Sequence, residues 1–183
     1  SMLSVLADAG YINAFGVDVS PEQVKLAKDM GVPNVHCQDF FEYIKENEVQ
    51  CDVVLGMDII EHFTKTELVG FLKRMRESLK PEGRVLFRTP NLDAPMATVF
   101  ANGDFTHENY MNQSSAEQVM LSCGFVKVRV LPSLMRTANP LKEFLRKIAY
   151  AIMRFRLQLL LFATARSIKG VLFSPNLVIE AKK

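Results

Sequence analysis

Three apolar segments of this chain each end in an aspartate, and this repeated pattern constrains the fold most. The segments are residues 12–17, 35–38 and 51–57, and the aspartates are Asp18, Asp39 and Asp58. The third segment is typical of a strand that is buried on both faces of a parallel sheet. In open α/β sheets ligands bind beyond the carboxyl ends of the strands. We therefore expect the three aspartates to lie at a ligand-binding edge.

Helix signals alternate with these strands. Ser20 and Pro21 indicate a helix start, and Thr64 with Glu67 forms a capping box before an amphipathic helix. A further helix is expected to begin at Ser115. Later strands are expected at residues 84–88, 125–131 and 176–181. The alternation predicts an α/β fold with a doubly wound, mostly parallel sheet.

The chain length and the helix pattern also predict its organisation. With 183 residues, 49% of them hydrophobic, the chain is too apolar for intrinsic disorder and has the size of one domain. We expect a core at residues 1–138, a basic helical insert at residues 139–170, and the final strand of the core at residues 171–183.

The cysteines and the lengths of the apolar segments indicate the cellular compartment in which the protein is expected. The three cysteines, Cys37, Cys51 and Cys123, are odd in number and widely spaced, which favours reduced thiols over disulfides or a zinc site. The longest charge-free run near the C-terminus, residues 157–165, is far shorter than the roughly 20 residues that a membrane span needs. No signal peptide pattern is present at the start. We expect a cytoplasmic protein, with membrane association left open.

The insert differs in charge from the rest of the chain. Between residues 139 and 170 there are seven basic side chains and one acid, Glu143. Residues 141–152 separate apolar from basic side chains as an amphipathic helix does, whereas arginines scatter after residue 153. This predicts peripheral membrane contact through residues 140–170, with a lid or a homodimer helix as the alternative. A nucleic-acid partner is disfavoured, because no exposed aromatic pattern accompanies the basic residues.

The first two aspartates could bind a nucleoside. A carboxylate before a Ser-Pro-capped helix, such as Asp18, can accept hydrogen bonds from both hydroxyls of a ribose. Asp39 beside Phe40 offers an acceptor for an amino group and an apolar face for a purine. The alternative is that Asp18 and Asp39 are turn residues or helix caps, positions that aspartate favours in any case.

The order of these pieces resembles the class I S-adenosylmethionine-dependent methyltransferases. The stretches that carry the resemblance are Phe15–Pro21, Gln38–Phe40, Asp52–Phe63 and Leu79–Phe87. The resemblance implies S-adenosylmethionine as the cofactor, with Asp18 and the adjacent Val19 at the ribose, Asp39 at the adenine amino group, Phe40 on the ring, and Gly56, Met57 and Asp58 at the methionine end. The family's first strand and glycine-rich loop are not found before residue 2, so we expect this chain to be part of a longer protein.

The motif Asp58-x-x-Glu61-His62 predicts the catalytic groups. His62, with Glu61 and with His107 from a later loop, is expected to activate an acceptor hydroxyl, since histidine is a natural base near neutral pH. Alternatively, His62 packs on the following helix and His107 is solvated. The motif also resembles that of the ubiquinone-pathway O-methyltransferases and the small-RNA 2′-O-methyltransferases, which bind a divalent ion. Because the first acid here is the shorter aspartate, we expect no metal.

These observations predict an S-adenosylmethionine-dependent methyltransferase, acting on oxygen of a small-molecule, glycan-type or lipid-linked acceptor. The later loops resemble bacterial methyltransferases associated with cell-surface glycan or lipid-carrier pathways. Two alternatives stay open. One is an NAD-type Rossmann oxidoreductase, because an acid after the second strand also binds ribose there. The other is a non-catalytic, degenerate methyltransferase-like binding domain.

Overall fold

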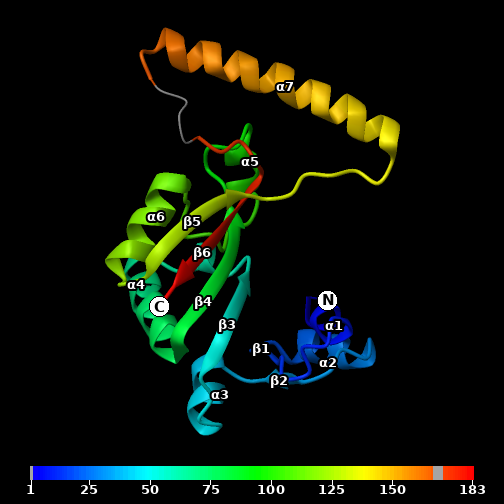
Figure 1. Ribbon diagram of the computed structural model, residues 1–183, viewed down its shortest axis with the longest axis vertical. Coiled ribbons are helices and arrows are strands. Elements are labelled where there is room, and N and C mark those ends of the chain that lie inside the picture. Colours follow the sequence, from blue (N-terminus) through cyan, green and yellow to red (C-terminus); the bar gives the residue numbers. More distant parts are fainter. Residues whose placement is uncertain (1, 167–170) are drawn as a thin grey trace. The chain divides into compact units, whose positions relative to one another are not determined.

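The computed structural model describes residues 2–166 and 171–183 (Figure 1). The chain forms two compact units, Ser1–Gln50 and Cys51–Lys183, which are considered separately below. Strands and helices alternate within both units, so the predicted α/β fold class is confirmed. Among the described residues, no helix combines the length and the apolar character needed to cross a lipid bilayer.

The first unit is a small parallel β-α-β arrangement. Its elements are α1 (Met2–Asp8), β1 (Gly16–Asp18), α2 (Pro21–Asp29), β2 (Val35–Cys37) and α3 (Phe40–Glu46). Strands β1 and β2 are parallel, so their carboxyl ends lie side by side. As predicted, Ser20 caps α2, and its Oγ accepts a hydrogen bond from the Gln23 N–H at 3.3 Å. Strand β1 begins at Gly16 rather than at residue 12, and α3 was not predicted.

The second unit contains a four-stranded mixed sheet. Its elements are β3 (Cys51–Met57), η1 (Ile60–His62), α4 (Lys65–Ser78), β4 (Leu79–Pro90), α5 (Ala97–Ala101), α6 (Gln113–Ser122), β5 (Val126–Pro132), α7 (Pro140–Ala163) and β6 (Asn176–Lys182). The strand order is β3-β4-β6-β5, with β3 and β4 parallel. Strand β6 runs antiparallel to both of its neighbours, so the last strand of the chain lies between β4 and β5 (Figure 1).

One face of this sheet forms the core. Burial alternates along β4 and β6, so that Val85, Phe87 and Ile179 are at most 1% exposed. Helix α4 contacts β4, and α6 contacts β5 and β6. The buried side chains that these helices contribute are Leu68, Leu72, Met75, Ala116 and Met120. The predicted amphipathic spacing of α4 therefore matches its packing against the sheet.

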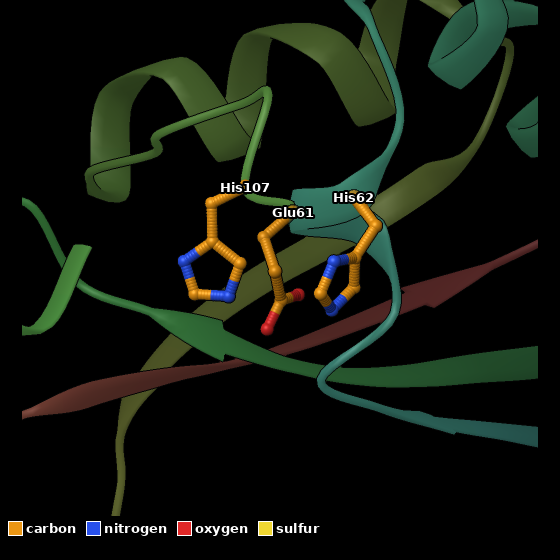
Figure 2. A group of neighbouring side chains, drawn as sticks. All are labelled: Glu61, His62 and His107. Carbon is orange, nitrogen blue, oxygen red and sulfur yellow. The ribbon is translucent and has the colours of Figure 1, made fainter. Parts of the chain in front are cut away.

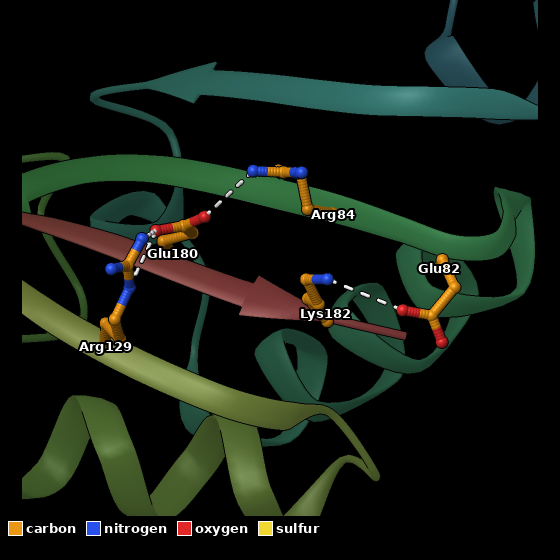
Figure 3. Close-up of polar contacts among 5 residues, drawn as sticks. All are labelled: Glu82, Arg84, Arg129, Glu180 and Lys182. Carbon is orange, nitrogen blue, oxygen red and sulfur yellow. Dashed lines mark hydrogen bonds and ion pairs between the residues drawn. The ribbon is translucent and has the colours of Figure 1, made fainter.

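The opposite face carries ion pairs that cross three strands (Figure 3). Glu180 of β6 pairs with Arg84 of β4 at 3.3 Å and with Arg129 of β5. Lys182 pairs with Glu82 at 3.4 Å. Both arginines are largely exposed, so each pair contributes little stability by itself. The pattern nevertheless favours the observed register, because a shift by one residue would turn these charges toward the core.

Two helix boundaries differ from the sequence-based expectation. Helix α6 is capped by Asn112 rather than by Ser115, because the two residues form a capping box. Asn112 Oδ1 accepts a hydrogen bond from the Ser115 N–H, and Ser115 Oγ accepts one from the Asn112 N–H. Asparagine caps helices as well as serine does. Helix α7 ends at Ala163, whereas the expected helical insert reaches residue 170; residues 167–170 lie outside the described part of the chain.

Candidate functional site

In the first unit, two carboxylates follow the ends of β1 and β2. Asp18 pairs with Cys37 across the two strands, and the Gln38 N–H donates to the Asp18 carbonyl at 3.1 Å. Asp39 comes next in the chain and caps α3, with its Oδ1 accepting from the N–H groups of Phe41 and Glu42. The parallel pairing thus brings Asp18 and Asp39 to one edge, as predicted from their positions after apolar segments.

Each of these carboxylates has one oxygen that is already engaged. Asp18 Oδ1 accepts from the Ser20 N–H at 2.8 Å, and Asp39 Oδ1 holds the helix start. Among the described residues, no hydrogen bond reaches Oδ2 of either side chain, so two acceptor oxygens remain at this edge. Ribose hydroxyls and the adenine amino group are donors, so these acceptors fit a nucleoside. The turn and capping roles of Asp18 and Asp39 are thus observed, and their role in binding a nucleoside stays a prediction.

The apolar residues predicted beside these acceptors lie in the same unit. Val19 is 72% exposed, directly after Asp18. Phe40 is half-buried and meets the Phe41 ring edge-on, with 5.5 Å between ring centroids. An exposed aliphatic group and a partly covered aromatic ring would both gain by covering a purine. The edge therefore has the polar and the apolar groups that a nucleoside requires.

In the second unit, the end of β3 carries Gly56, Met57 and Asp58. A Cβ at Gly56 would lie 2.6 Å from a ring carbon of the buried Phe87, so glycine is required here for packing. Met57 is 41% exposed. Asp58 has a left-handed φ of 52°, which aspartate tolerates, and its carboxylate forms a two-point ion pair with Arg88. This pair holds the Asp58 side chain beside β4.

Glu61 is the most deeply buried charged residue of the described chain, with 1% of its surface exposed. Its Oε2 accepts from the Thr89 hydroxyl at 3.1 Å, while its Oε1 is buried without a hydrogen-bond partner. Burial raises the pKa of the Glu61 carboxyl above its ordinary value. A buried oxygen without a partner is costly, and such a group points to a proton, a cation or a ligand donor at that position.

His62 is held by the loop before α6. Its Nδ1 lies 3.0 Å from the Thr106 hydroxyl oxygen and 3.3 Å from the Thr106 carbonyl oxygen. The Thr106 hydroxyl itself donates to Asp104 at 2.7 Å. Because a carbonyl can only accept, Nδ1 must carry the proton, and the lone pair of the neutral ring is on Nε2. Nε2 of His62 is therefore the nitrogen with the free lone pair.

His107 is oriented in the same manner. Its Nδ1 lies 2.9 Å from the Ala101 carbonyl, so its Nε2 is also the nitrogen with the free lone pair. The centroids of the His62 and His107 rings lie 4.9 Å apart, and the ring planes are inclined by 65°. Figure 2 shows the Glu61 carboxylate between them, and ligand atoms of the three residues lie within 4.8 Å of one another. The structure therefore brings Glu61, His62 and His107 together.

Asp58 does not join this cluster, although the sequence motif places it three residues before Glu61. Arg88 occupies both of its carboxylate oxygens, and the cluster of ligand atoms in the described chain contains Glu61, His62 and His107 alone. Sequence reasoning did not identify Arg88, Thr89 or Thr106 as part of the site. Arg88 is the last residue of the expected strand at residues 84–88 and Thr89 follows it, and that position was the signal available for them.

The comparisons with known proteins agree with the fold. The family described as "Methyltransferase domain" matches residues 1–130, which is most of the chain. This match favours a methyltransferase over the oxidoreductase alternative. No curated protein matches the sequence.

Several solved structures share the fold. A methyltransferase dependent on S-adenosylmethionine from Archaeoglobus fulgidus is 21% identical, with a TM-score of 0.67, and the match covers 100% of this chain and 80% of that one. Phosphoethanolamine N-methyltransferase 2 of Haemonchus contortus is 19% identical, with a TM-score of 0.53 over 92% of this chain and 43% of that one. Human N-acetylserotonin methyltransferase is 16% identical, with a TM-score of 0.53 over 89% and 38%.

This chain thus spans less than half of the last two proteins. Both of those structures contain S-adenosylmethionine. At these identities the structural likeness shows the fold, and the family match over residues 1–130 shows the family. The acceptors of these proteins differ from one another, so their names identify no acceptor for this chain. The chain belongs to the class I S-adenosylmethionine-dependent methyltransferases.

Proposed function

We propose that this protein methylates a hydroxyl group, with His62 as the base. The observation that supports this is the hydrogen bonding of His62, whose Nδ1–H donates to Thr106 and leaves Nε2 as the proton acceptor. A hydroxyl needs such a base when it attacks a methyl group, because it loses its proton as the new bond forms. An amine acceptor bears a lone pair when neutral and has less need of a base.

The roles of the neighbouring groups follow from their contacts. Deprotonation of the acceptor makes His62 cationic, and the nearby Glu61 carboxylate then stabilises the imidazolium. Asp104 accepts from Thr106 and orients the hydroxyl oxygen toward His62. His107 Nε2 provides a second acceptor that can bind a neighbouring hydroxyl of the substrate and so position it. We assign His62 as the base and Glu61 and His107 as its catalytic partners.

S-adenosylmethionine supplies the electrophilic methyl group in this reaction. Asp18 Oδ2 and Asp39 Oδ2 are the acceptors that we assign to the ribose hydroxyls and the adenine amino group, with Val19 and Phe40 covering the nucleoside. We assign Gly56, Met57 and Asp58 to the methionine end. Arg88 holds the Asp58 carboxylate in place and reduces the net negative charge beside the predicted transfer site.

For the acceptor, we propose a small molecule or a glycan, including a glycan linked to a lipid. A sugar hydroxyl has a high pKa, so a base fixed within hydrogen-bond distance is required for its methylation at neutral pH. The cluster of Glu61, His62 and His107 offers three groups that can bind hydroxyls, which suits a polyol better than an apolar amine.

The test is transfer of a labelled methyl group from S-adenosylmethionine to a panel of free and lipid-linked sugars, with the new bond identified by mass spectrometry. We expect methylated oxygen with the full chain, and a loss of at least about 100-fold for His62→Gln. His36→Gln is the matched control, because His36 lies on β2 and contacts Tyr43. Methyl transfer to nitrogen or carbon, or full activity of His62→Gln, would contradict the proposal.

Retained binding separates a catalytic loss from a binding loss. His62→Gln should bind S-adenosylhomocysteine as the unsubstituted chain does, measured by isothermal titration calorimetry. If the unsubstituted chain binds S-adenosylhomocysteine yet transfers no methyl group to any acceptor of the panel, the non-catalytic alternative replaces this proposal.

A second candidate mechanism uses a divalent ion at the same cluster. Two histidines and a carboxylate whose ligand atoms lie within 4.8 Å of one another form a donor set that transition metals accept. The carbonyls of Thr106 and Ala101 hold both imidazoles in the tautomer that a metal at Nε2 needs. Such an ion would lower the pKa of a bound hydroxyl.

The two mechanisms differ in their response to metals. If His62 acts as a free base, dialysis against EDTA leaves the rate unchanged, and added Mn²⁺ or Zn²⁺ inhibits because it takes the Nε2 lone pair. If an ion is required, EDTA abolishes transfer and Mn²⁺ or Zn²⁺ restores it. Glu61→Gln should then weaken metal binding in a direct titration, independently of any acceptor.

A further inference from the structure

Helix α7 has an apolar stripe along its whole length. The spacing of three or four residues places the stripe on one side of the helix, about 100° wide. Its residues are Leu141, Phe144, Leu145, Ile148, Ile152, Phe155, Leu159 and Phe162, and each is between 43% and 82% exposed. The stripe residues continue through the second half of the helix, where Arg154 and Arg156 lie on different sides of it and the exposed Leu160 lies outside it.

The stripe is the more exposed side of helix α7. Most partly covered residues of α7 lie on the opposite side, and Gln158 lies on the flank; those on the opposite side are Glu143, Arg146, Tyr150, Met153, Leu157 and Leu161. Near the start of the helix, Glu143 accepts from the Thr137 N–H at 3.0 Å and pairs with Arg146 at 2.7 Å. Farther along the helix this side carries Tyr150, Met153, Leu157 and Leu161. A lid would cover its apolar stripe, whereas no residue of α7 is buried.

Basic residues border the stripe on both sides. By helical position, Lys147 and Arg154 lie along one border and Lys142 and Arg156 along the other. All four are exposed, and none has an ion pair within the described residues. The only acid of the helix, Glu143, lies on the other side and is neutralised by Arg146.

This distribution of charge identifies the surface that the stripe fits. An apolar strip bordered by cations matches the boundary between the acyl chains and the phosphates of an anionic bilayer, where long basic side chains reach the phosphates. Two α7 helices packed stripe to stripe would instead place their basic borders close together. Charge complementarity therefore favours lipid over a second copy of the chain.

A hollow beside the first turns of α7 has the same chemistry. Its volume is about 550 Å³, and its lining includes Arg136, Phe144, Lys147 and the acid Glu143, whose charge is paired with Arg146. Cationic groups next to an aromatic ring suit a phosphate on an apolar chain. We propose that α7 binds in the plane of an anionic phospholipid bilayer, with the stripe in the acyl boundary and the four basic residues at the phosphates. The proposal does not depend on which acceptor is methylated.

The test is flotation of the full chain with vesicles of phosphatidylcholine alone and of phosphatidylcholine containing 30% (about one lipid in three) phosphatidylglycerol. We expect flotation with the anionic vesicles, at least about tenfold more than with neutral ones, and a loss at high salt. Ile148→Asp with Phe155→Asp should abolish flotation. Leu121→Asp, an equally exposed apolar position of α6, is the matched control and should float normally.

Reversal of the border charges tests the electrostatic part. Lys142→Glu combined with Arg156→Glu should reduce flotation about tenfold, whereas Lys65→Glu with Lys73→Glu on α4 should not. Circular dichroism spectra of all variants should match that of the unsubstituted chain, which excludes unfolding as the cause. Equal flotation with neutral and anionic vesicles would overturn the proposal. So would a dimer that the stripe substitutions dissociate while no variant binds vesicles.

Discussion

Thr106 accepts a hydrogen bond from the Nδ1–H of His62, although 44 residues separate the two positions in the chain. A residue of the loop before α6 thus determines which ring nitrogen of His62 carries the proton, and His62 itself lies in the turn after β3. This relationship predicts that Thr106 is a positioning residue. Thr106→Val, which keeps the size and removes the hydroxyl, should lower kcat roughly 10- to 100-fold with little change in KM. Thr106→Ser keeps the hydroxyl and should restore the rate.

A measurement of kcat against pH checks that role. If Thr106 orients His62, the valine variant should also show an altered fall of kcat at low pH, where the base is protonated, because the imidazole has lost a partner of its Nδ1–H. Thr98→Val, in α5, changes the same residue type outside the cluster and is the control. An unaltered pH profile in Thr106→Val would mean that the contact is only structural.

Asp39 has two roles that a pair of substitutions can separate. Asp39→Asn keeps an oxygen for capping α3, since asparagine is an equally good cap, but it replaces the free Oδ2 by a donor that repels the adenine amino group. We expect unchanged unfolding and about tenfold weaker binding of S-adenosylhomocysteine, measured by calorimetry. Asp39→Ala should in addition cost about 0.5–2 kcal/mol of stability. Equal affinity of Asp39→Asn and the unsubstituted chain would rule out the assigned adenine contact.

Gly56 offers a prediction about packing. A Cβ at this position would meet the buried Phe87 ring, so Gly56→Ala should destabilise the protein by about 1–3 kcal/mol in urea unfolding. Gly70→Ala is the matched comparison, because a Cβ at this exposed position of α4 would meet no atom beyond its own helix within 4 Å. Alanine should stabilise that helix by about 0.5–1 kcal/mol. Opposite signs at the two glycines are the expected result.

Glu143 predicts a pH dependence at the start of α7. Arg146, followed by the Thr137 N–H, lowers the pKa of the Glu143 carboxyl to about 2 from an ordinary value of 4.5. A lowered pKa in the folded state means that ionised Glu143 stabilises the folded form above pH 4.5. This contribution is lost as the pH falls through 4.5 toward 2.

Hydrogen exchange at the Thr137 amide measures this effect. Protection of that amide should decline as the pH falls from 4.5 to 2, once exchange rates are corrected for their intrinsic pH dependence. Glu143→Gln should show no such decline over the same range. An identical decline in both proteins would assign the effect to another carboxyl group.

Local patterns in the sequence were sufficient to predict most of the fold. The Thr64 capping box and the apolar spacing of α4 are signals within a few residues, and both are confirmed. Strand β3 has its predicted bounds because its apolar run is unbroken up to Asp58. Asn112 was missed as a cap because Ser115, three residues later, is an equally strong signal and in fact completes the same box.

The candidate site was predictable only in part, because its remaining groups come from distant segments. Glu61 and His62 belong to one motif, and His107 was proposed from its loop. The ion pair that occupies Asp58 needs Arg88, which pairing of β3 with β4 brings alongside. The contact between His62 and Thr106 depends on a loop conformation that no periodic pattern encodes. The contacts that orient His62 and Asp58 could therefore be found only from the tertiary structure.

The main-chain carbonyl of Glu61 accepts hydrogen bonds from the N–H groups of Glu108 and Asn109, both at 2.9 Å. The attachment of the His107 loop to the turn that carries His62 thus uses backbone atoms at position 61. The side chain at that position can change without loss of these two bonds. A substitution at position 61 would therefore change the chemical group between the two histidines, while the two main-chain hydrogen bonds that attach the His107 loop are kept.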